Sequence, residues 1–298
     1  MLKKSIMIAG VVLILLSAFI YYQIDLKLDQ MEIDTDNVIE EEADPSVPSL
    51  PIEQLTVEQP EEKREDFYAL IIGLDQRGSS FMLNTDSLIV AHLVPQSGIV
   101  KLISIPRDQK VQTSSGEDIK VNAVFASGYQ AAVNAARKNP DLLSGKRVSI
   151  GSLSIHEEYI SSGIASLRST LERFLSVPID YTYLVNFETV VELVDAVGGV
   201  EINVDRSMQY TAQFDGTSIQ LEKGLQVLDG RNALNYSRHR LDDRGVQYES
   251  SDFDRGRRQQ EVITALVKKI TSWNNISKAM GLLDIVTSNV KTEMKRSK

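Results

Sequence analysis

Residues 67–74, Phe67-Tyr-Ala-Leu-Ile-Ile-Gly-Leu74, form a continuous apolar run with the length of a strand that is buried on both faces. Two further runs follow, Ser87-Leu-Ile-Val-Ala-His-Leu-Val94 and Ile99-Val-Lys-Leu-Ile-Ser-Ile105. Only Pro95-Gln-Ser-Gly98 separates these two, and so short a turn predicts an antiparallel hairpin. These three strands are expected to form the centre of a sheet.

Charged residues flank these strands at positions that share one end of the sheet, provided that the first strand runs parallel to the third. Asp75 comes directly after the first strand and Asp86 directly before the second, while Arg107 and Asp108 follow the third. Two carboxylates and a guanidinium at one sheet end predict a site for a metal ion and a phosphate group. The alternative is structural: Asp75 and Asp86 would cap turns, and Arg107 would pair locally with Asp108.

The rest of the chain alternates helical and strand patterns. Helices are predicted over 121–137, 155–174, 186–197, 229–236, 251–273 and 274–290, strands over 181–185 and 200–204, a loop over 139–154, and an irregular stretch over 206–228 that allows a hairpin across Asp215-Gly216. Asn186, Asp229 and the pair Ser251 and Asp254 are placed to cap three of these helices. Strands that alternate with helices predict an α/β fold with helices on both faces of the sheet.

A second group of cations lies in Tyr236-Ser-Arg-His-Arg240 and Asp252-Phe-Asp-Arg-Gly-Arg-Arg-Gln-Gln260. These segments and the loop between them hold five acidic residues and six arginines, Arg238, Arg240, Arg244, Arg255, Arg257 and Arg258. In an extended chain Arg238 and Arg240 would point the same way, and Arg255 and Gln259 lie one helical turn apart. Arginines bind phosphate oxygens in pairs, and a helix N-terminus adds its amides, so the pattern indicates a phosphate-binding cleft. The alternative is a surface helix covered with salt bridges.

The chain of 298 residues carries a net charge of −9, and this charge is unevenly distributed. Residues 25–66 hold fifteen acidic residues against three basic ones, whereas residues 67–298 have a net charge of +1. A folded part so close to neutral argues against nucleic acid as a partner. Cysteine is absent, which excludes disulfides, thiolate metal sites and cysteine nucleophiles.

Residues 5–24 contain no charged side chain and are long enough to cross a bilayer as a helix. Two lysines precede this segment and Asp25 follows it, so the positive-inside rule predicts a single-pass cell-membrane protein with a cytoplasmic tail of residues 1–4. No small-residue cleavage site follows, so an uncleaved anchor is favoured over a signal peptide. Residues 25–66, acidic and rich in proline, predict an extracytoplasmic linker, and residues 67–298 predict the folded domain.

Six motifs, in this order, resemble those of the LytR-CpsA-Psr family. They are Gly73-Leu-Asp-Gln-Arg77, Asn84-Thr-Asp86, Ser104-Ile-Pro-Arg-Asp108, Val194-Asp-Ala-Val-Gly-Gly-Val200, Leu234-Asn-Tyr-Ser-Arg-His-Arg240 and Ser251-Asp-Phe-Asp-Arg-Gly-Arg-Arg-Gln259. Each motif alone is a weak signal, but their order and spacing agree across about residues 67–275. The chain is therefore identified as similar to this family over its whole folded part.

The resemblance implies a membrane-anchored, extracytoplasmic enzyme of Gram-positive bacteria, with an α/β/α sandwich around a mixed central sheet. Members of the family transfer a glycopolymer, such as teichoic acid or capsule, from a polyprenyl-pyrophosphate carrier to peptidoglycan and form a phosphodiester. By position, the metal Mg²⁺, or Mn²⁺ in its place, would be held by Asp75 and Asp86. The pyrophosphate would be bound by Arg107, Arg238, Arg240, Arg255 and Gln259, with Arg77 and Asp108 in support. Arg107, Arg238, Arg240 and Asp86 would act in catalysis, Asp86 as the general base.

Two other functions use the same residues. The site could hydrolyse a polyprenyl pyrophosphate, or the protein could be a non-catalytic, membrane-anchored binder of lipid-linked glycan. A role in transcription fits poorly, because the chain shows neither a helix-turn-helix pattern nor a basic recognition face. Asn84-Thr85, Asp254 and a long loop between Arg240 and Asp252 depart from the common family pattern, and they could alter the choice of polymer or acceptor.

Overall fold

The computed structural model describes residues 31–33, 38–39, 66–77, 80–150, 153–212, 216–272 and 276–293. Within that part the elements are β1 (Phe67–Arg77), β2 (Ser80–Val94), β3 (Ile99–Ile105), β4 (Lys110–Gln112), β5 (Asp118–Lys120), α2 (Val121–Lys138), η1 (Pro140–Leu142), β6 (Arg147–Ile150), β7 (Leu153–His156), α3 (Glu157–Leu175), β8 (Tyr181–Asn186), α4 (Phe187–Ala196), β9 (Val200–Val204), β10 (Met208–Thr211), β11 (Ser218–Leu221), β12 (Gly224–Leu228), α5 (Gly230–Arg238), η2 (Val246–Tyr248), α6 (Asp252–Thr271), α7 (Ile276–Asn289) and β13 (Val290–Thr292). The expected membrane segment, residues 5–24, lies outside the described residues. None of the helices described is both long and apolar enough to cross a membrane.

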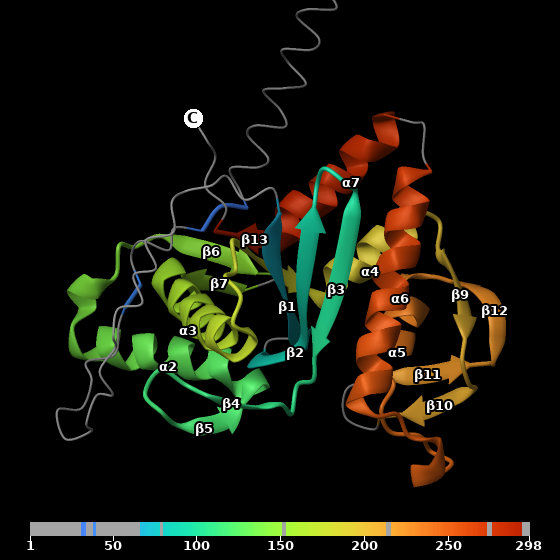
Figure 1. Ribbon diagram of the computed structural model, residues 1–298, viewed down its shortest axis with the longest axis horizontal. Coiled ribbons are helices and arrows are strands. Elements are labelled where there is room, and N and C mark those ends of the chain that lie inside the picture. The colour runs from blue at the N-terminus through green and yellow to red at the C-terminus, as the bar shows by residue number, and fades with distance from the viewer. Residues whose placement is uncertain are drawn as a thin grey trace, which may run out of the picture.

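Five strands form the central sheet in the order β13-β8-β1-β2-β3 (Figure 1). Both β1 and β3 pair antiparallel with β2, so they run parallel to each other, as the sequence analysis requires for a shared sheet end. β8 lies parallel to β1 on the other side, and β13 pairs antiparallel with β8. The sheet is therefore mixed, and the mixed α/β fold predicted from the sequence is confirmed.

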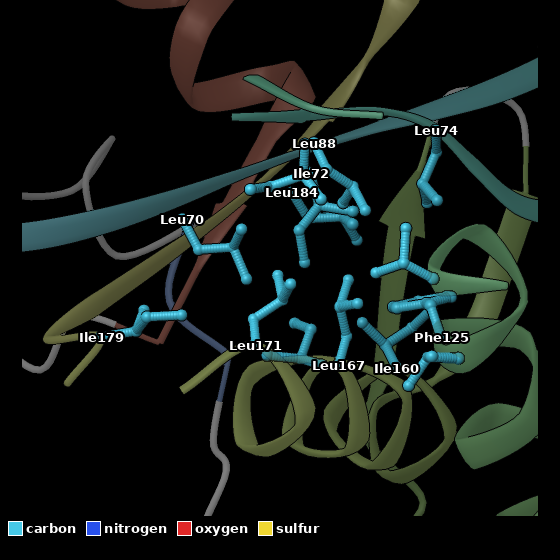
Figure 2. Packing of buried hydrophobic residues seen from close by; sticks show 14 of the residues in the cluster. Leu70, Ile72, Leu74, Leu88, Phe125, Ile160, Leu167, Leu171, Ile179 and Leu184 are labelled. Atoms are coloured by element: carbon cyan, nitrogen blue, oxygen red, sulfur yellow. The ribbon is translucent and has the colours of Figure 1, made fainter. Parts of the chain in front are cut away.

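One face of the sheet packs on α2 and α3 mainly through apolar side chains. Alternate residues of β1 point to this face, among them Leu70 and Ile72, and they meet Phe125 of α2 and Leu167 of α3 (Figure 2). All four side chains are fully buried. The apolar stripe of the segment 155–174 thus faces the core, because residues three and four apart share one side of a helix.

Helices α4, α5, α6 and α7 lie on the opposite face and share a second apolar cluster with β9 and β11 (Figure 1). Val262 and Leu266 of α6 belong to this cluster, together with Tyr236 of α5. The first turns of α6 reach the sheet itself, where Ser104 Oγ donates to Gly256 O over 3.2 Å. A Cβ on Gly256 would lie 2.9 Å from Ser104 Cβ, so only glycine allows α6 to come this close to β3.

A short segment before the domain is part of the fold. Ile33 is fully buried in the core of the α2–α3 face, and its amide nitrogen donates to Thr292 O over 2.7 Å. Ile39 N donates to Ser162 Oγ of α3 over 3.1 Å. These residues fall within the segment 25–66 that is predicted as a linker, because the surrounding acidic composition masks a short apolar alternation. The folded unit therefore includes residues that precede residue 67.

Other differences from the predicted elements are local. The predicted loop 139–154 contains the hairpin of β6 and β7, where Val148, Ile150 and Ile155 are buried on one side. The hairpin expected within 206–228 is formed by β10 and β11, and β12 in the same stretch pairs with β9. The short strand β13 lies at the end of a segment predicted as helix. Such three- to five-residue strands carry too little periodicity to be recognised in isolation.

Candidate functional site

The candidate site lies at the sheet end where β1 and β3 finish and β2 begins. Gly73 of β1 lies opposite Ser87 of β2, and Leu88 lies opposite Ile105 of β3. The start of α6 covers this end, because Ser87 Oγ donates to Gln259 Oε1 over 3.0 Å. The hydrogen bond joins segments that are 172 residues apart in the chain. The two groups of charged residues found in the sequence therefore meet here.

A pocket of about 240 Å³ opens between the end of β3 and the first turns of α6. It is lined by Ser104, Ile105, Pro106, Arg107, Asp252, Phe253, Arg255, Gly256, Arg257, Gln259 and Gln260. Three of the residues expected to bind pyrophosphate, Arg107, Arg255 and Gln259, share this one pocket. Two of the expected arginines, Arg238 and Arg240, do not line it.

Arg255 is placed by the N-terminus of α6. Its guanidinium Nη1 donates to Asp252 Oδ1 over 3.2 Å, and the residue is only 6% exposed although it lines the pocket. The predicted capping box is confirmed: Ser251 Oγ accepts from Asp254 N, and Asp254 Oδ2 accepts from Ser251 N. A cation with little contact with water, beside the positive end of a helix, attracts an anion more strongly than a solvated arginine does.

Arg107 belongs to a group of charges just beyond β3. Its Nε lies 3.8 Å from Asp108 Oδ1, and Lys120 Nζ lies 3.0 Å from the same oxygen. The hydrogen bond from Lys120 lowers the pKa of Asp108, and the positive charges of Lys120, Arg107 and Arg240 act in the same direction. Arg240 therefore lies close enough to Asp108 for its positive charge to stabilise the carboxylate. The structure thus brings the end of α5 towards the end of β3.

Arg238 ends helix α5 rather than lying in an extended segment, so the expected alternation of Arg238 and Arg240 along a strand is wrong. Its guanidinium carbon sits 5.1 Å from the centre of the Phe187 ring. A Cβ on Gly73 would come within 2.8 Å of the same ring. Arg238 therefore lies on the Phe187 ring that packs against Gly73, near the end of β1, and Phe187 holds it there by a cation–π contact.

The other three arginines of the cluster are structural. Arg257 Nη2 lies 2.7 Å and Arg258 Nη2 3.0 Å from Asp205 Oδ2, and Arg244 Nε lies 2.7 Å from Asp242 Oδ1. Burial alone would raise the pKa of Asp205, but the hydrogen bonds and charges of Arg258 and Arg257 lower it. For these three residues the salt-bridge alternative is correct, since their acidic partners hold them in place.

For the two metal ligands expected from the sequence, Asp75 and Asp86, the structure describes the backbone but not the side chain. Asp75 lies in β1 and Asp86 in β2, and the register shifts there, because Gly73 pairs with Ser87 and Leu74 with Thr85. The side chains of Asp75, Arg77 and Asp86 lie outside the described residues. Among the side chains that are described, no three His, Asp or Glu residues gather as a metal site. Two carboxylates on adjacent strands are a donor set that fits Mg²⁺, which often keeps several of its waters.

Four residues that hold the site together are not among those predicted from the sequence. Ser87 and Ser104 anchor α6 to the sheet, Phe187 supports Arg238, and Asp205 holds Arg258. Of these four residues, only Ser104 belongs to one of the six motifs, Ser104-Ile-Pro-Arg-Asp108, and the motif does not indicate its contact with α6. The arrangement as a whole is a pocket at the end of a sheet, beside a helix N-terminus, lined by Arg107, Arg255 and Gln259 and also by Arg257, which pairs with Asp205. Such a site can bind phosphate oxygens and offset charge during phosphoryl transfer.

Comparison with known proteins agrees with the motifs. The model of the LytR_cpsA_psr family matches residues 22–298. The polyisoprenyl-teichoic acid–peptidoglycan teichoic acid transferase TagU of Bacillus mycoides is 32% identical over 234 residues, which are 78% of this chain and 62% of that protein. The chain therefore spans less than two thirds of this relative.

Two solved structures are similar to the fold. Bacillus subtilis TagV has a TM-score of 0.55 and 26% identity, over 78% of this chain and 76% of that one. The protein gbs0355 of Streptococcus agalactiae has a TM-score of 0.57 and 26% identity, over 78% of this chain and 70% of that one.

Proposed function

The chain belongs to the LytR_cpsA_psr family, and from this premise we propose that it transfers an anionic glycopolymer from a polyprenyl-pyrophosphate carrier to peptidoglycan. The observation that carries the proposal is the pocket that Arg107, Arg255 and Gln259 share at the end of the sheet. The family relative named as a teichoic acid transferase supports the same reaction class. Teichoic acid or another anionic glycopolymer is the expected donor.

The reaction forms a phosphodiester between the two polymers. A hydroxyl oxygen of peptidoglycan attacks the phosphorus that carries the glycopolymer, and the bridging P–O bond breaks. Polyprenyl phosphate leaves with the bonding electron pair, and the hydroxyl proton passes to a base, for which Asp86 is the candidate. Arg107 and Arg255 offset the negative charge of the diphosphate, and positioning and electrostatics supply most of the catalysis.

The amide of Gln259 has a more limited task. Its oxygen accepts a hydrogen bond from Ser87, so its nitrogen is the group that can donate to a phosphate oxygen. Arg238 and Arg240 approach the same sheet end from α5 and would bind the outer part of the headgroup. Arg77 is a further candidate for the same anion.

Asp75 and Asp86 would hold Mg²⁺, or Mn²⁺ in its place. The support is the donor chemistry: two carboxylates on the adjacent strands β1 and β2, one on each side of the Leu74–Thr85 pair. When bound, the ion supplies positive charge to the diphosphate oxygens and helps to orient them. The metal requirement is part of the proposal and is tested with the transfer reaction.

We place the domain outside the cell membrane. Residues 5–24 would form the anchor, with residues 1–4 in the cytoplasm, because two lysines precede the apolar segment and acidic residues follow it. This topology would bring the domain to the side where peptidoglycan lies. The acidic residues of 25–66 would also keep the linker away from anionic lipid.

The test is a transfer reaction with the full-length protein in detergent, using a radiolabelled polyprenyl-pyrophosphate glycan and peptidoglycan chains. We expect label to become covalently attached to peptidoglycan only when Mg²⁺ is present, and Arg107→Ala to abolish most of this product. Arg137→Ala is the matched control. Arg137 is exposed in the last turn of α2, whereas Arg107 contacts the other end of this helix, where Asn122 N donates to Arg107 O.

Each rival function gives a different product. A hydrolase would release the labelled glycan phosphate without any acceptor, and a binder would retain the intact donor without turnover. Transfer that continues at full rate without a divalent metal, or with Arg107→Ala, would contradict the proposal.

A further inference from the structure

His239 lies between Arg238 and Arg240 and is fully buried. Its Nδ1 is 2.8 Å from Ser250 Oγ, and its Nε2 is 3.2 Å from Asp242 Oδ2. Both partners come from the loop that joins α5 to α6. The middle residue of the Arg-His-Arg segment is thus the point at which this segment is fixed to the protein.

Ser250, His239 and Asp242 have the order of contacts found in serine hydrolases, but they cannot act as such a triad. Ser250 is only 7% exposed. Its hydroxyl oxygen also accepts a hydrogen bond from Arg258 Nη1 over 2.8 Å. A nucleophile needs access to its substrate, which this serine does not have. The three side chains therefore need another explanation.

The hydrogen bonds run in one direction through the cluster. Arg258 can only donate, and the carboxylate of Asp242, whose pKa is held well below its usual range by Arg244, accepts. A hydroxyl that accepts from Arg258 can still donate its own proton, so Ser250 can donate to His239 Nδ1 while His239 Nε2 donates to Asp242. This chain of donors is the one that the neutral imidazole makes when its proton is on Nε2.

The cluster connects the two parts of the candidate phosphate site. Ser250 N donates to Arg240 O over 2.8 Å, while Ser250 Oγ accepts from Arg258 of α6. Helix α6 also carries Arg255 and Gln259, which line the pocket. Through His239 and Ser250, the segment with Arg238 and Arg240 is therefore tied to the helix with Arg255 and Gln259.

We propose that His239 is a positioning residue that sets Arg238 and Arg240 at their working distance from Arg255 and Gln259. This inference rests on the proposed function, because it assigns these residues to one anionic substrate. His239 itself does not touch that substrate. Its neutral form keeps this chain of hydrogen bonds intact. Protonation at Nδ1 makes the imidazole the donor towards Ser250, which reverses this hydrogen bond and loosens the segment that carries Arg238 and Arg240.

The surroundings of His239 favour the neutral form of its imidazole. Burial is the largest effect and lowers the pKa of the imidazole, and the positive charges of Arg258 from α6 and Arg206 from the segment after β9 add to it. The hydrogen bond and charge of Asp242 act in the opposite direction but do not outweigh the burial. We therefore expect a loss of activity on the acidic side of neutral pH that belongs to this histidine.

The experiment measures kcat and KM of the full-length protein from pH 5 to pH 8 in the transfer reaction. The variants are His239→Leu, His239→Gln and Ser250→Ala, with Val246→Ala as the control, because Val246 is highly exposed in the same loop. A displacement of about 1 Å at a reacting group can cost about a hundredfold in rate, so we expect a loss of that order in kcat/KM for His239→Leu. His239→Gln can still donate to Asp242 and should recover part of the activity, without the acidic fall seen in the native protein.

Ser250→Ala keeps the proposal testable if His239→Leu does not fold. It removes the proton donor to Nδ1 and should lower kcat/KM by up to about tenfold, the scale of one net hydrogen bond. The inference is overturned if His239→Leu, folded as shown by its melting temperature, keeps kcat/KM within twofold of Val246→Ala. It is also overturned if His239→Gln shows the same acidic fall as the native protein.

Two further variants separate this inference from the proposed function. Arg240→Ala and Arg255→Ala should both lose activity if these residues bind the substrate. If both arginine variants lose activity and His239→Leu keeps it, the inference about His239 fails and the proposed function stands. If both arginine variants keep full activity, the proposed function fails and the inference fails with it.

Discussion

The two faces of the central sheet are packed in different ways. On the α2–α3 face, leucine, isoleucine and phenylalanine side chains fill most of the space (Figure 2), and a long hydrogen bond of 3.5 Å joins Thr85 Oγ1 of β2 to Asn122 O of α2. On the α6 face near the site, Ser87 and Ser104 bond to Gln259 and Gln260, and Arg258 is fully buried against Asp205. Apolar burial contributes most to stability, whereas directed polar contacts fix geometry at a modest net gain. The difference between the faces thus separates the part that holds the fold from the part that holds the site.

The largest expected effect is on the apolar face. Phe125→Ala removes a fully buried ring from between α2 and the sheet and should lower the free energy of unfolding by about 3–5 kcal/mol. Phe174→Ala is the matched control, because Phe174 is 44% exposed at the end of α3. Urea denaturation of both variants measures the difference. A loss below 1 kcal/mol for Phe125→Ala would mean that this face does not carry the core.

Arg255→Ala should show the opposite behaviour. It removes a cation from the pocket and is expected to lower kcat/KM by roughly a hundredfold to a thousandfold, the range for one donor that stabilises a charged transition state. Stability should change little compared with Phe125→Ala. Steady-state kinetics and urea denaturation of Arg255→Ala and the exposed control Arg137→Ala test both statements. A variant that loses stability but keeps its kinetics would place Arg255 with the structural arginines.

Asp205→Asn should have an intermediate effect on stability, because it removes the charged partner of the fully buried Arg258. Two hydrogen bonds from Arg258 end on this carboxylate, and we expect a loss of about 1–3 kcal/mol in the free energy of unfolding. The control is Glu188→Gln, which weakens the exposed pair with Arg231 and should cost less than about 1 kcal/mol. Equal losses for the two variants would show that burial of Arg258 adds nothing to the pair.

The smallest effect is the pH dependence of that same contact. The folded-state pKa of Asp205 is lowered, so its contribution to stability is complete above the unfolded-state value of about 3.9 and is lost as the pH falls towards the folded-state value. The difference in stability between the native protein and Asp205→Asn should therefore shrink below about pH 4. Chemical denaturation between pH 3 and pH 7 measures it. A difference that stays constant over this range would contradict the assignment of the lowered pKa.

The apolar face could be predicted from the sequence, because it depends on local patterns. Continuous apolar runs gave β1 and β3, and the side-chain caps at Asn186 and Asp229 mark the starts of α4 and α5. The short strands could not be predicted in the same way. The short strand β13 is an example: its Thr292 accepts a hydrogen bond from Ile33 N, more than 250 residues away in the chain, and no local pattern indicates such a pairing.

The site could be predicted only in outline. Position at strand ends and the one-turn spacing of Arg255 and Gln259 indicated residues that the pocket does bring together. The sequence could not tell these arginines from Arg257 and Arg258, because the acidic residue that engages the latter two lies 52 and 53 positions away. Long-range partners of this kind decide which arginines remain directed at a ligand.

The most direct test of the central claim is a crystal structure of the protein with a non-reactive polyprenyl-pyrophosphate glycan. The account predicts that the diphosphate lies in the pocket between β3 and α6, with its oxygens within hydrogen-bond distance of Arg107 and Arg255. A diphosphate bound elsewhere on the molecule, with this pocket left to solvent, would contradict it.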